Sequence, residues 1–222
     1  MKFFVATLVF SISLANIDLA KVWEVPGDCA TIQAALDSCS TGDTVLVSSG
    51  IYYENILWPN TQAILLASGG SSETIIDGEQ QGSVITIDVE LDTLTVINGF
   101  TIQNGKAWNG GGISIENSNP KLIDIIVRYN RTSWGDWVHG GGIYCNNSNP
   151  ILTNIIIFRN EVWGEDGEGF GGGMACINSN PILTNVSIIC PVYVPNIFVA
   201  ACGKSWRSIS PMRTASSISC PI

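Results

Sequence analysis

The 222-residue sequence predicts an all-β fold in which short parallel strands wind into a solenoid. The first observation is a repeat with two markers, a Gly-Gly-Gly triplet and a Ser-Asn-Pro triplet. The glycines lie at 110–112, 140–142 and 171–173, and Ser-Asn-Pro lies at 118–120, 148–150 and 179–181. Both markers recur after 30 and then 31 residues, and a fixed period of this length indicates stacked structural repeats. The second observation is composition, because 23 glycines and only 13% charged residues favour strands and tight turns over helices.

The third observation is alternation within each repeat, which predicts strands with one buried face. Ser114, Tyr144 and Ala175 are expected on the outer face. Their neighbours are expected in the core: Ile113, Ile115, Ile143, Cys145, Met174 and Cys176. These strands follow one another too closely for strand–helix–strand units. From Thr44 onward the sequence holds about five such coils.

A register of polar residues is expected at an inward corner of the solenoid. Asn98, Asp124, Asn154 and Asn185 occupy corresponding places in the repeats. Stacked about 4.8 Å apart, their side chains would pass hydrogen bonds from one coil to the next.

A helix is predicted at 28–39, before the first repeat. Its apolar residues fall at i, i+3, i+4 and i+7, so they share one face. They are Ile32, Ala35, Leu36 and Cys39. Asp28 or Thr31 caps the start of this helix, and Gly42 ends it. The helix would cover the open end of the solenoid, where strand edges are otherwise unpaired.

Several stretches of the sequence follow a recognisable order. Ile-Gln-Ala-Ala-Leu at 32–36 precedes Gly-Asp-Thr-Val at 42–45 and Gly-Ile-Tyr-Tyr-Glu-Asn at 50–55. Ile-Ile-Asp-Gly follows at 75–78, then Val-Ile-Thr-Ile at 84–87 and Asn-Gly-Phe-Thr-Ile at 98–102. With the repeated triplets, they resemble the right-handed parallel β-helix proteins of the pectate-lyase-like (pectin lyase fold) superfamily. The resemblance implies a single-stranded right-handed parallel β-helix with a short N-terminal capping α-helix. It is specific for the fold and poorly specific for activity.

The sequence divides into four parts. Residues 1–15 are a predicted secretory signal peptide, with a lysine, an apolar run and a small-residue cleavage site. Residues 21–42 are predicted to form a linker and the capping helix, and residues 43–189 the β-helix. Residues 190–222 contain three basic and no acidic residues, together with 4 of the 9 prolines. This last part predicts an irregular tail, either a truncated or out-of-register end or a dedicated C-terminal cap.

The charge of the central part limits its partners. Residues 21–189 hold 6 Lys and Arg and 18 Asp and Glu, a net charge of −12. Such a surface repels phosphate backbones, which argues against nucleic acid as a partner. It is compatible with neutral glycans, or with acidic glycans bridged by a divalent cation. No segment after the signal peptide is long and apolar enough to span a membrane.

Tryptophans in the loops are the first candidate site. Each of three asparagines is followed by a tryptophan after four, four and three residues. The pairs are Asn104 with Trp108, Asn130 with Trp134, and Asn160 with Trp163, and Trp137 lies in the same loop as Trp134. Stacked coils would place these indoles in a column, and exposed aromatic faces stack on sugar rings. The alternative is that the loops fold back and the indoles only cover the side of the coils.

A carboxylate pair is the second candidate. Asp88 and Glu116 occupy equivalent outward positions on neighbouring coils, followed by Asn146 and Ile177. Like charges about 5 Å apart are unfavourable unless they share a proton or a cation, so this pair is a candidate calcium site. Lyases of the resembled superfamily hold calcium with strand-borne Asp and Glu and use Arg or Lys as a base. Arg128 and Arg131 are present, but no sequence feature places them over the pair.

Other candidates are weaker. The loop carrying Glu161, Glu165, Asp166 and Glu168 offers the oxygen ligands that calcium prefers, but without an EF-hand pattern. His139 is the single histidine and has no Ser or Cys partner at triad spacing, so an exposed loop position is expected. Gly50-x-Tyr52-x-Glu54 resembles the beginning of pectin methylesterases, but no later Asp-Phe-x-x-Gly or Gly-Arg-Pro-Trp is present. The Asn-Thr-Asp and Asp-Asp motifs of polygalacturonases are missing too.

The cysteines are expected to be structural. Cys29 and Cys39 flank the predicted helix, so they would lie roughly 15 Å apart, beyond the reach of a disulfide. Cys145 and Cys176 follow Gly-Gly-Gly at the same spacing and are expected as stacked, core-facing thiols.

Together these features predict a secreted or cell-surface β-helix, a monomer, that binds a polysaccharide or surface glycan along a loop-bearing side without an assignable catalytic site. No cofactor is required, apart from calcium if the carboxylate pair binds it. A calcium-dependent polysaccharide lyase or glycoside hydrolase, and a purely structural stalk or adhesin segment, remain the alternatives.

Overall fold

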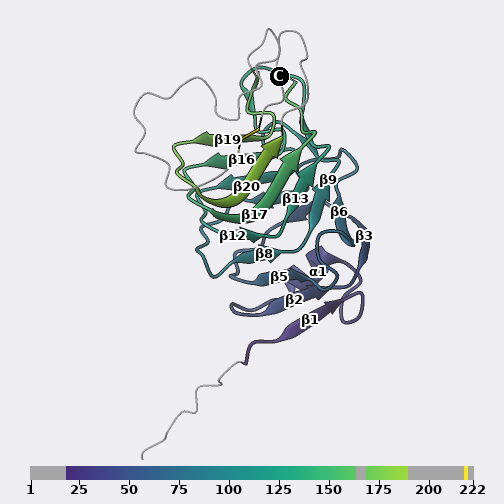
Figure 1. Cartoon of the computed structure of the whole chain (residues 1–222). Coiled ribbons are helices and arrows are strands. Elements are labelled where there is room, and N and C mark those ends of the chain that lie inside the picture. Colours follow the sequence, from purple (N-terminus) through teal and green to yellow (C-terminus); the bar gives the residue numbers. More distant parts are fainter. Residues whose placement is uncertain (1–18, 164–168, 190–217, 220–222) are drawn as a thin grey trace, which may run out of the picture.

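The computed structural model describes residues 19–163, 169–189 and 218–219, and these form a right-handed parallel β-helix (Figure 1). The predicted signal peptide, most of the predicted tail and residues 164–168 lie outside the described residues. All strand pairs are parallel, and successive strands pair with the coil before and after them. The predicted all-β solenoid is therefore confirmed.

Each coil contributes strands to three faces. The first face stacks β1 (Val22–Val25), β2 (Thr44–Val47), β5 (Ile64–Ala67), β8 (Val96–Asn98) and β12 (Lys121–Ile123). The second face stacks β3 (Gly50–Tyr53), β6 (Thr74–Asp77), β9 (Thr101–Gln103) and β13 (Ile126–Arg128). The long strands β17 (Ile151–Phe158) and β20 (Ile182–Ile189) run through both faces and join them into one twelve-stranded sheet, and β21 (Ile218–Ser219) pairs with β20.

The third face is a separate five-stranded stack. It consists of β4 (Ile56–Leu57), β7 (Ile85–Ile87), β11 (Ile113–Glu116), β16 (Ile143–Asn146) and β19 (Met174–Ile177). From β4 to β19 the chain makes about four turns of the solenoid, close to the five coils expected. Four shorter strands lie in the loops: β10 (Lys106–Ala107), β14 (Arg131–Thr132), β15 (Val138–His139) and β18 (Gly169–Phe170).

The core follows the predicted alternation. Ile113 pairs with Ile143, and Ile143 pairs with Met174; all three are buried. Cys145 is also fully buried. The stacked position above it, Cys176, was expected in the core but is exposed. The reason is that β19 is the last strand of its stack within the described residues.

The outer side of the third face is covered, which alternation alone did not predict. Ser114, Tyr144 and Ala175 face outward but are 6–8% exposed. The loop before each third-face strand folds back onto this side. At Gly110, an added Cβ would lie 2.8 Å from the Cα of Ser114. The loops are therefore a second layer on the solenoid.

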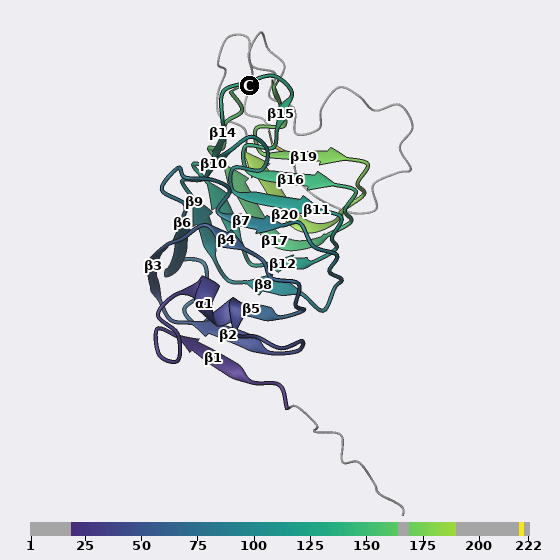
Figure 2. The same cartoon turned by 180° about the vertical axis from the view of Figure 1, so that it is seen from behind.

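The predicted helix exists and is shorter than expected. α1 (Ile32–Asp37) starts at Thr31, whose hydroxyl accepts a hydrogen bond from the Ala34 amide. Thr31 is therefore the cap, whereas the Asp28 carboxylate accepts from the Glu24 amide. The apolar residues of α1 are buried in the same core as the strands, so the helix closes the interior at this end of the stack (Figure 2).

Part of the predicted linker is a strand. Val22–Val25 form β1, the first rung of the first face, in register with β2. Asp43 fixes this rung, because its carboxylate accepts from the Lys21 amide at 2.7 Å and from the Trp23 indole at 3.2 Å. Composition suggested a linker because the strand is short and lies next to charged residues.

The polar corner register is confirmed at Asp124, Asn154 and Asn185 but is wrong by one residue at Asn98. Asn98 pairs with Ile123, so Gly99, not Asn98, is equivalent to Asp124, and Asn154 and Asn185 follow. These four positions have positive φ values of 52–85°, which glycine, asparagine and aspartate tolerate best. The side chains of Asp124, Asn154 and Asn185 are exposed and not inward. Asn154 donates to Asp124 and Asn185 donates to Asn154, both at 2.8 Å.

The repeated triplets build the scaffold. The Ser148 hydroxyl, which is buried, accepts from the Ser118 amide at 3.1 Å, and the Ser148 amide donates to the Ser179 hydroxyl at 2.9 Å. In the glycine triplets, the middle position allows backbone to touch backbone. An added Cβ at Gly141 would lie 2.1 Å from the Glu161 carbonyl oxygen.

Candidate functional site

The loops between the second and third faces form an ordered side of the molecule. We call residues 104–109, 130–139 and 160–163 the loop flank. Lys106 pairs with Arg131 in a parallel ladder, and Arg131 pairs with Glu161 in the next coil. Further along the same loops, Val138 pairs with Gly169. The flank is therefore held by backbone hydrogen bonds.

A buried asparagine ladder anchors the start of each flank loop. The side-chain Oδ1 of Asn130 accepts from the Gly105 backbone amide at 2.8 Å, and the side-chain Oδ1 of Asn160 accepts from the Asn130 backbone amide at 3.0 Å. Both asparagine side chains are at most 2% exposed. Gly105 is thus the equivalent of Asn130 and Asn160, whereas Asn104 is equivalent to Tyr129, which shares its positive φ.

This register changes the predicted tryptophan column. Trp108 and Trp163 occupy equivalent positions, with Ser133 between them, and Trp134 lies one residue further on. The Ser133 amide donates to the Ala107 carbonyl oxygen, and the Trp163 amide donates to the Thr132 hydroxyl at 2.7 Å. The flank therefore does not carry one indole directly above the next in every coil.

Three tryptophans present large exposed surfaces in two neighbouring loops. Trp108 is 54% exposed, and Trp134 and Trp137 are each 63% exposed. An added Cβ at Gly135 would lie 2.4 Å from the Trp108 ring. The Trp108 indole therefore rests against the turn that carries the other two. We call Trp108, Trp134 and Trp137 the tryptophan patch.

Trp163 is placed differently. Its indole nitrogen donates to the Glu161 carboxylate at 2.8 Å, and the Arg131 guanidinium lies 4.5 Å from its ring centre. A cation over an aromatic face is attracted by the ring electrons, so this face is already occupied. Trp163 braces the ladder at the end of the flank.

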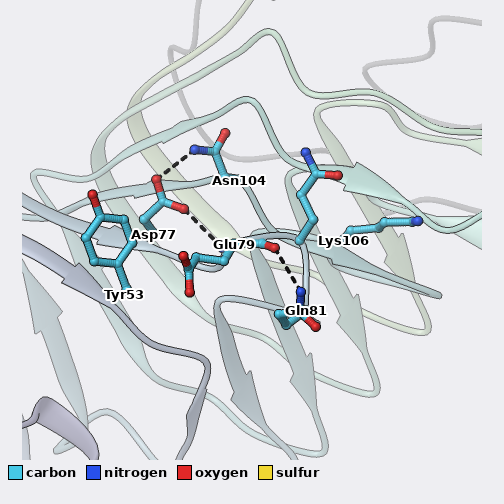
Figure 3. A pocket seen from close by; sticks show the side chains of 7 residues that line it. Tyr53, Asp77, Glu79, Gln81, Asn104 and Lys106 are labelled. Carbon is cyan, nitrogen blue, oxygen red and sulfur yellow. Dashed lines mark hydrogen bonds between the residues drawn. The ribbon is translucent and has the colours of Figure 1, made fainter.

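A pocket of about 570 Å³ opens beside the loop flank, where the second face meets the first flank loop (Figure 3). Seven residues from successive coils line it: Tyr53, Asp77, Glu79, Gln80, Gln81, Asn104 and Lys106. Sequence reasoning missed this site, although the Ile-Ile-Asp-Gly stretch containing Asp77 was noted. The pocket connects to the flank because the Arg131 guanidinium donates to the Gln80 amide oxygen.

Asp88 and Glu116 lie on the third face at equivalent positions. Ile87 pairs with Ile115, so the two carboxylates follow on neighbouring coils, and Glu116 pairs with Asn146. Among the described residues, no group of three or more His, Cys, Asp and Glu side chains gathers as a metal site.

Arg128 and Arg131, the two arginines considered with the carboxylate pair, lie on other elements. Arg128 is on the second face and donates to the Gln103 amide oxygen at 3.0 Å, and Arg131 bonds to Gln80. Of the predicted acidic loop, Glu161 bonds to Trp163. Glu165, Asp166 and Glu168 lie outside the described residues.

His139 is not the exposed loop residue that was predicted. It is half-buried in β15, where its ring stacks on Phe170 at 5.6 Å between centroids and lies 6.1 Å from Tyr144. Burial lowers the pKa of His139 below its ordinary value, and a hydrogen bond to the Trp137 backbone partly opposes this. Its role is to pack the loop layer.

In the three described stretches, no helix is long and apolar enough to cross a membrane. No family model and no curated protein matches the sequence.

Among solved structures, the chain is similar to a pectin methylesterase mutant in complex with a hexasaccharide, at 13% identity and a TM-score of 0.43. The match covers 79% of this chain and 66% of that chain, so this protein spans just under two thirds of that enzyme's length. At this identity the likeness concerns the fold alone. The β-helix itself is established by the strand register.

Proposed function

We propose that the protein binds carbohydrate through the tryptophan patch, as a secreted or cell-surface monomer. The observation that supports this most is the exposure of Trp108, Trp134 and Trp137, at 54–63% each. Large aromatic side chains on a surface mark interaction sites when they gather, and flat indole faces suit sugar rings.

The rigidity of the flank supports the same function. The loops that carry the patch are held by parallel ladders and by the buried Asn130–Asn160 pair. A rigid aromatic surface loses little conformational entropy when a ligand binds. The net charge of −12 over residues 21–189 favours a glycan over a nucleic acid.

The test is retention of the protein on a panel of insoluble neutral and acidic polysaccharides. The triple variant Trp108→Ala, Trp134→Ala, Trp137→Ala should lose retention on whichever polysaccharide binds the wild type. Leu94→Ala is the matched control, because Leu94 is equally exposed, at 63%, but lies in a turn away from the flank. Unchanged retention of the triple variant would contradict the proposal.

A further inference from the structure

We infer that the pocket beside the loop flank binds one neutral sugar residue of the glycan and discriminates against uronic acids. This inference rests on the proposed function and names the class of glycan. A fixed carboxylate, free polar groups and an aromatic side chain surround the pocket.

The carboxylate of Asp77 is held in one orientation. One of its oxygens accepts from the Gln103 amide at 2.9 Å and from the Asn104 amide at 2.7 Å. The other accepts from the Glu79 backbone amide at 3.0 Å. Asp77 is 7% exposed. The three N–H donors fix the position of this carboxylate, so it presents an oriented acceptor at the pocket.

Several groups around Asp77 are available to a ligand. Within the described residues, no hydrogen bond or ion pair is formed by the Glu79 carboxylate, the Lys106 amine or the Tyr53 hydroxyl. Figure 3 shows the Glu79 carboxylate on the same side as Asp77 and the Tyr53 ring, with the Lys106 amine extending away from them. The pocket thus offers acceptors at one end and a donor at the other.

Tyr53 supplies the apolar contact. It is 61% exposed at the edge of the pocket, and its ring is a flat surface on which a pyranose ring can stack. A stacking ring with hydrogen-bonding groups around it is the arrangement that recognises a hydroxylated, largely neutral ring.

The charges select among sugars. A uronate would bring its carboxylate towards Asp77 and Glu79, and like charges at short range disfavour binding. The single positive charge of Lys106 does not offset the negative charges of the two carboxylates. A neutral hexose meets no such repulsion, because its hydroxyls donate to the same oxygens.

The pocket is positioned to act together with the flank. Gln80, in the pocket wall, accepts from Arg131, and Arg131 lies over Trp163. Lys106 also lines the pocket and lies two residues before Trp108 in the same flank loop, so a chain of sugars that occupies the pocket can continue towards the tryptophan patch.

The experiment compares neutral and uronate oligosaccharides of equal length and linkage by isothermal titration calorimetry. The wild type should bind the neutral series about tenfold more tightly or better. Tyr53→Ala should weaken neutral binding about tenfold, and Tyr53→Phe should restore most of it because the ring is kept. Glu79→Gln should reduce the preference for neutral sugars, whereas Glu90→Gln, an exposed carboxylate outside the pocket, should not.

The outcomes separate the two proposals. If the triple tryptophan variant loses binding while Glu79→Gln leaves the neutral-to-uronate ratio unchanged, the pocket assignment is wrong and the tryptophan patch stands. Equal binding of both series by the wild type overturns the pocket assignment as well. If the wild type binds no glycan, both proposals fail.

Discussion

The side-chain amide of Gln33 pairs with the backbone of Leu57 as a neighbouring strand would. The Gln33 nitrogen donates to the Leu57 carbonyl oxygen at 2.9 Å, and the Leu57 amide donates to the Gln33 oxygen at 2.8 Å. Leu57 is in β4, the first strand of the third face, and within the described residues the outer edge of β4 has no strand partner. One helical side chain therefore satisfies this strand edge, which would otherwise invite pairing with another chain.

Gln33→Ala should destabilise the fold by about 2 kcal/mol, because its two hydrogen bonds with the Leu57 backbone, worth about 1 kcal/mol each, are lost together with an exposed one to Asp37. Urea unfolding followed by tryptophan fluorescence measures this difference. Gln81→Ala is the control, since Gln81 is exposed and its side chain makes one local hydrogen bond. Equal stability of the two variants would show that the pairing with Leu57 contributes nothing.

Asp43 should make stability depend on acid pH. The Lys21 backbone amide is the largest cause that lowers the pKa of Asp43, followed by Ser40, Trp23 and the Lys21 charge, while burial opposes them. Because the folded pKa is below the ordinary value of about 3.9, the stabilisation is fully present above that value. It is lost as the pH falls through the folded pKa.

The corresponding measurement compares wild type with Asp43→Asn. The variant should be less stable by about 2 kcal/mol at pH 7, and the difference in unfolding free energy should shrink towards pH 3. A difference that stays constant over this range would assign the effect of the substitution to shape and not to charge.

Gly135→Ala should weaken carbohydrate retention with little loss of stability. The new Cβ would overlap the outer atoms of the Trp108 ring, at 2.4 and 2.7 Å. The exposed indole can swing away, so the cost is small, but the patch loses its arrangement. Gly82→Ala is the control, because the nearest atom to its added Cβ is at 3.7 Å. Full retention by Gly135→Ala would mean that the position of Trp108 is unimportant.

The stacked thiols should differ in reactivity. Cys176 is exposed, whereas Cys145 is fully buried. A hydrogen bond with Cys176, followed by burial, raises the pKa of the Cys145 thiol. Since the thiolate is the reactive form, a maleimide at pH 7 should label Cys176 and leave Cys145 unmodified until the protein unfolds. Peptide mass spectrometry gives the two extents, and rapid labelling of Cys145 in the native state would contradict the stacking.

The fold could be predicted because the two triplet markers recur at a fixed spacing. The register of one coil on the next could not be predicted to the exact residue. Left-handed corner positions accept glycine, asparagine and aspartate alike. Asn98 therefore looked equivalent to Asp124 although Gly99 is, and Asn104 looked equivalent to Asn130 although Gly105 is. The residue types matched at these places, but the backbone conformation determines which positions are equivalent.

Only part of the candidate site could be predicted, for a related reason. Exposed tryptophans were expected, but the cover of Arg131 over Trp163 depends on the alignment of two coils. The pocket was missed because Tyr53, Asp77 and Asn104 come from three different coils and follow no repeat. Such a site appears only when the coils are stacked.

The constant strand register after loops of different length has a consequence for how this protein can diversify. From the buried anchor to the triplet, the three flank loops span five, ten and eleven positions, Gly105 to Gly110, Asn130 to Gly140 and Asn160 to Gly171. The strands that follow nevertheless stay in register. The length of a loop therefore does not alter the geometry of the coil that follows it, and one loop can be exchanged for another. Recognition of a new ligand can be acquired by replacing one loop while the rest of the molecule folds as before.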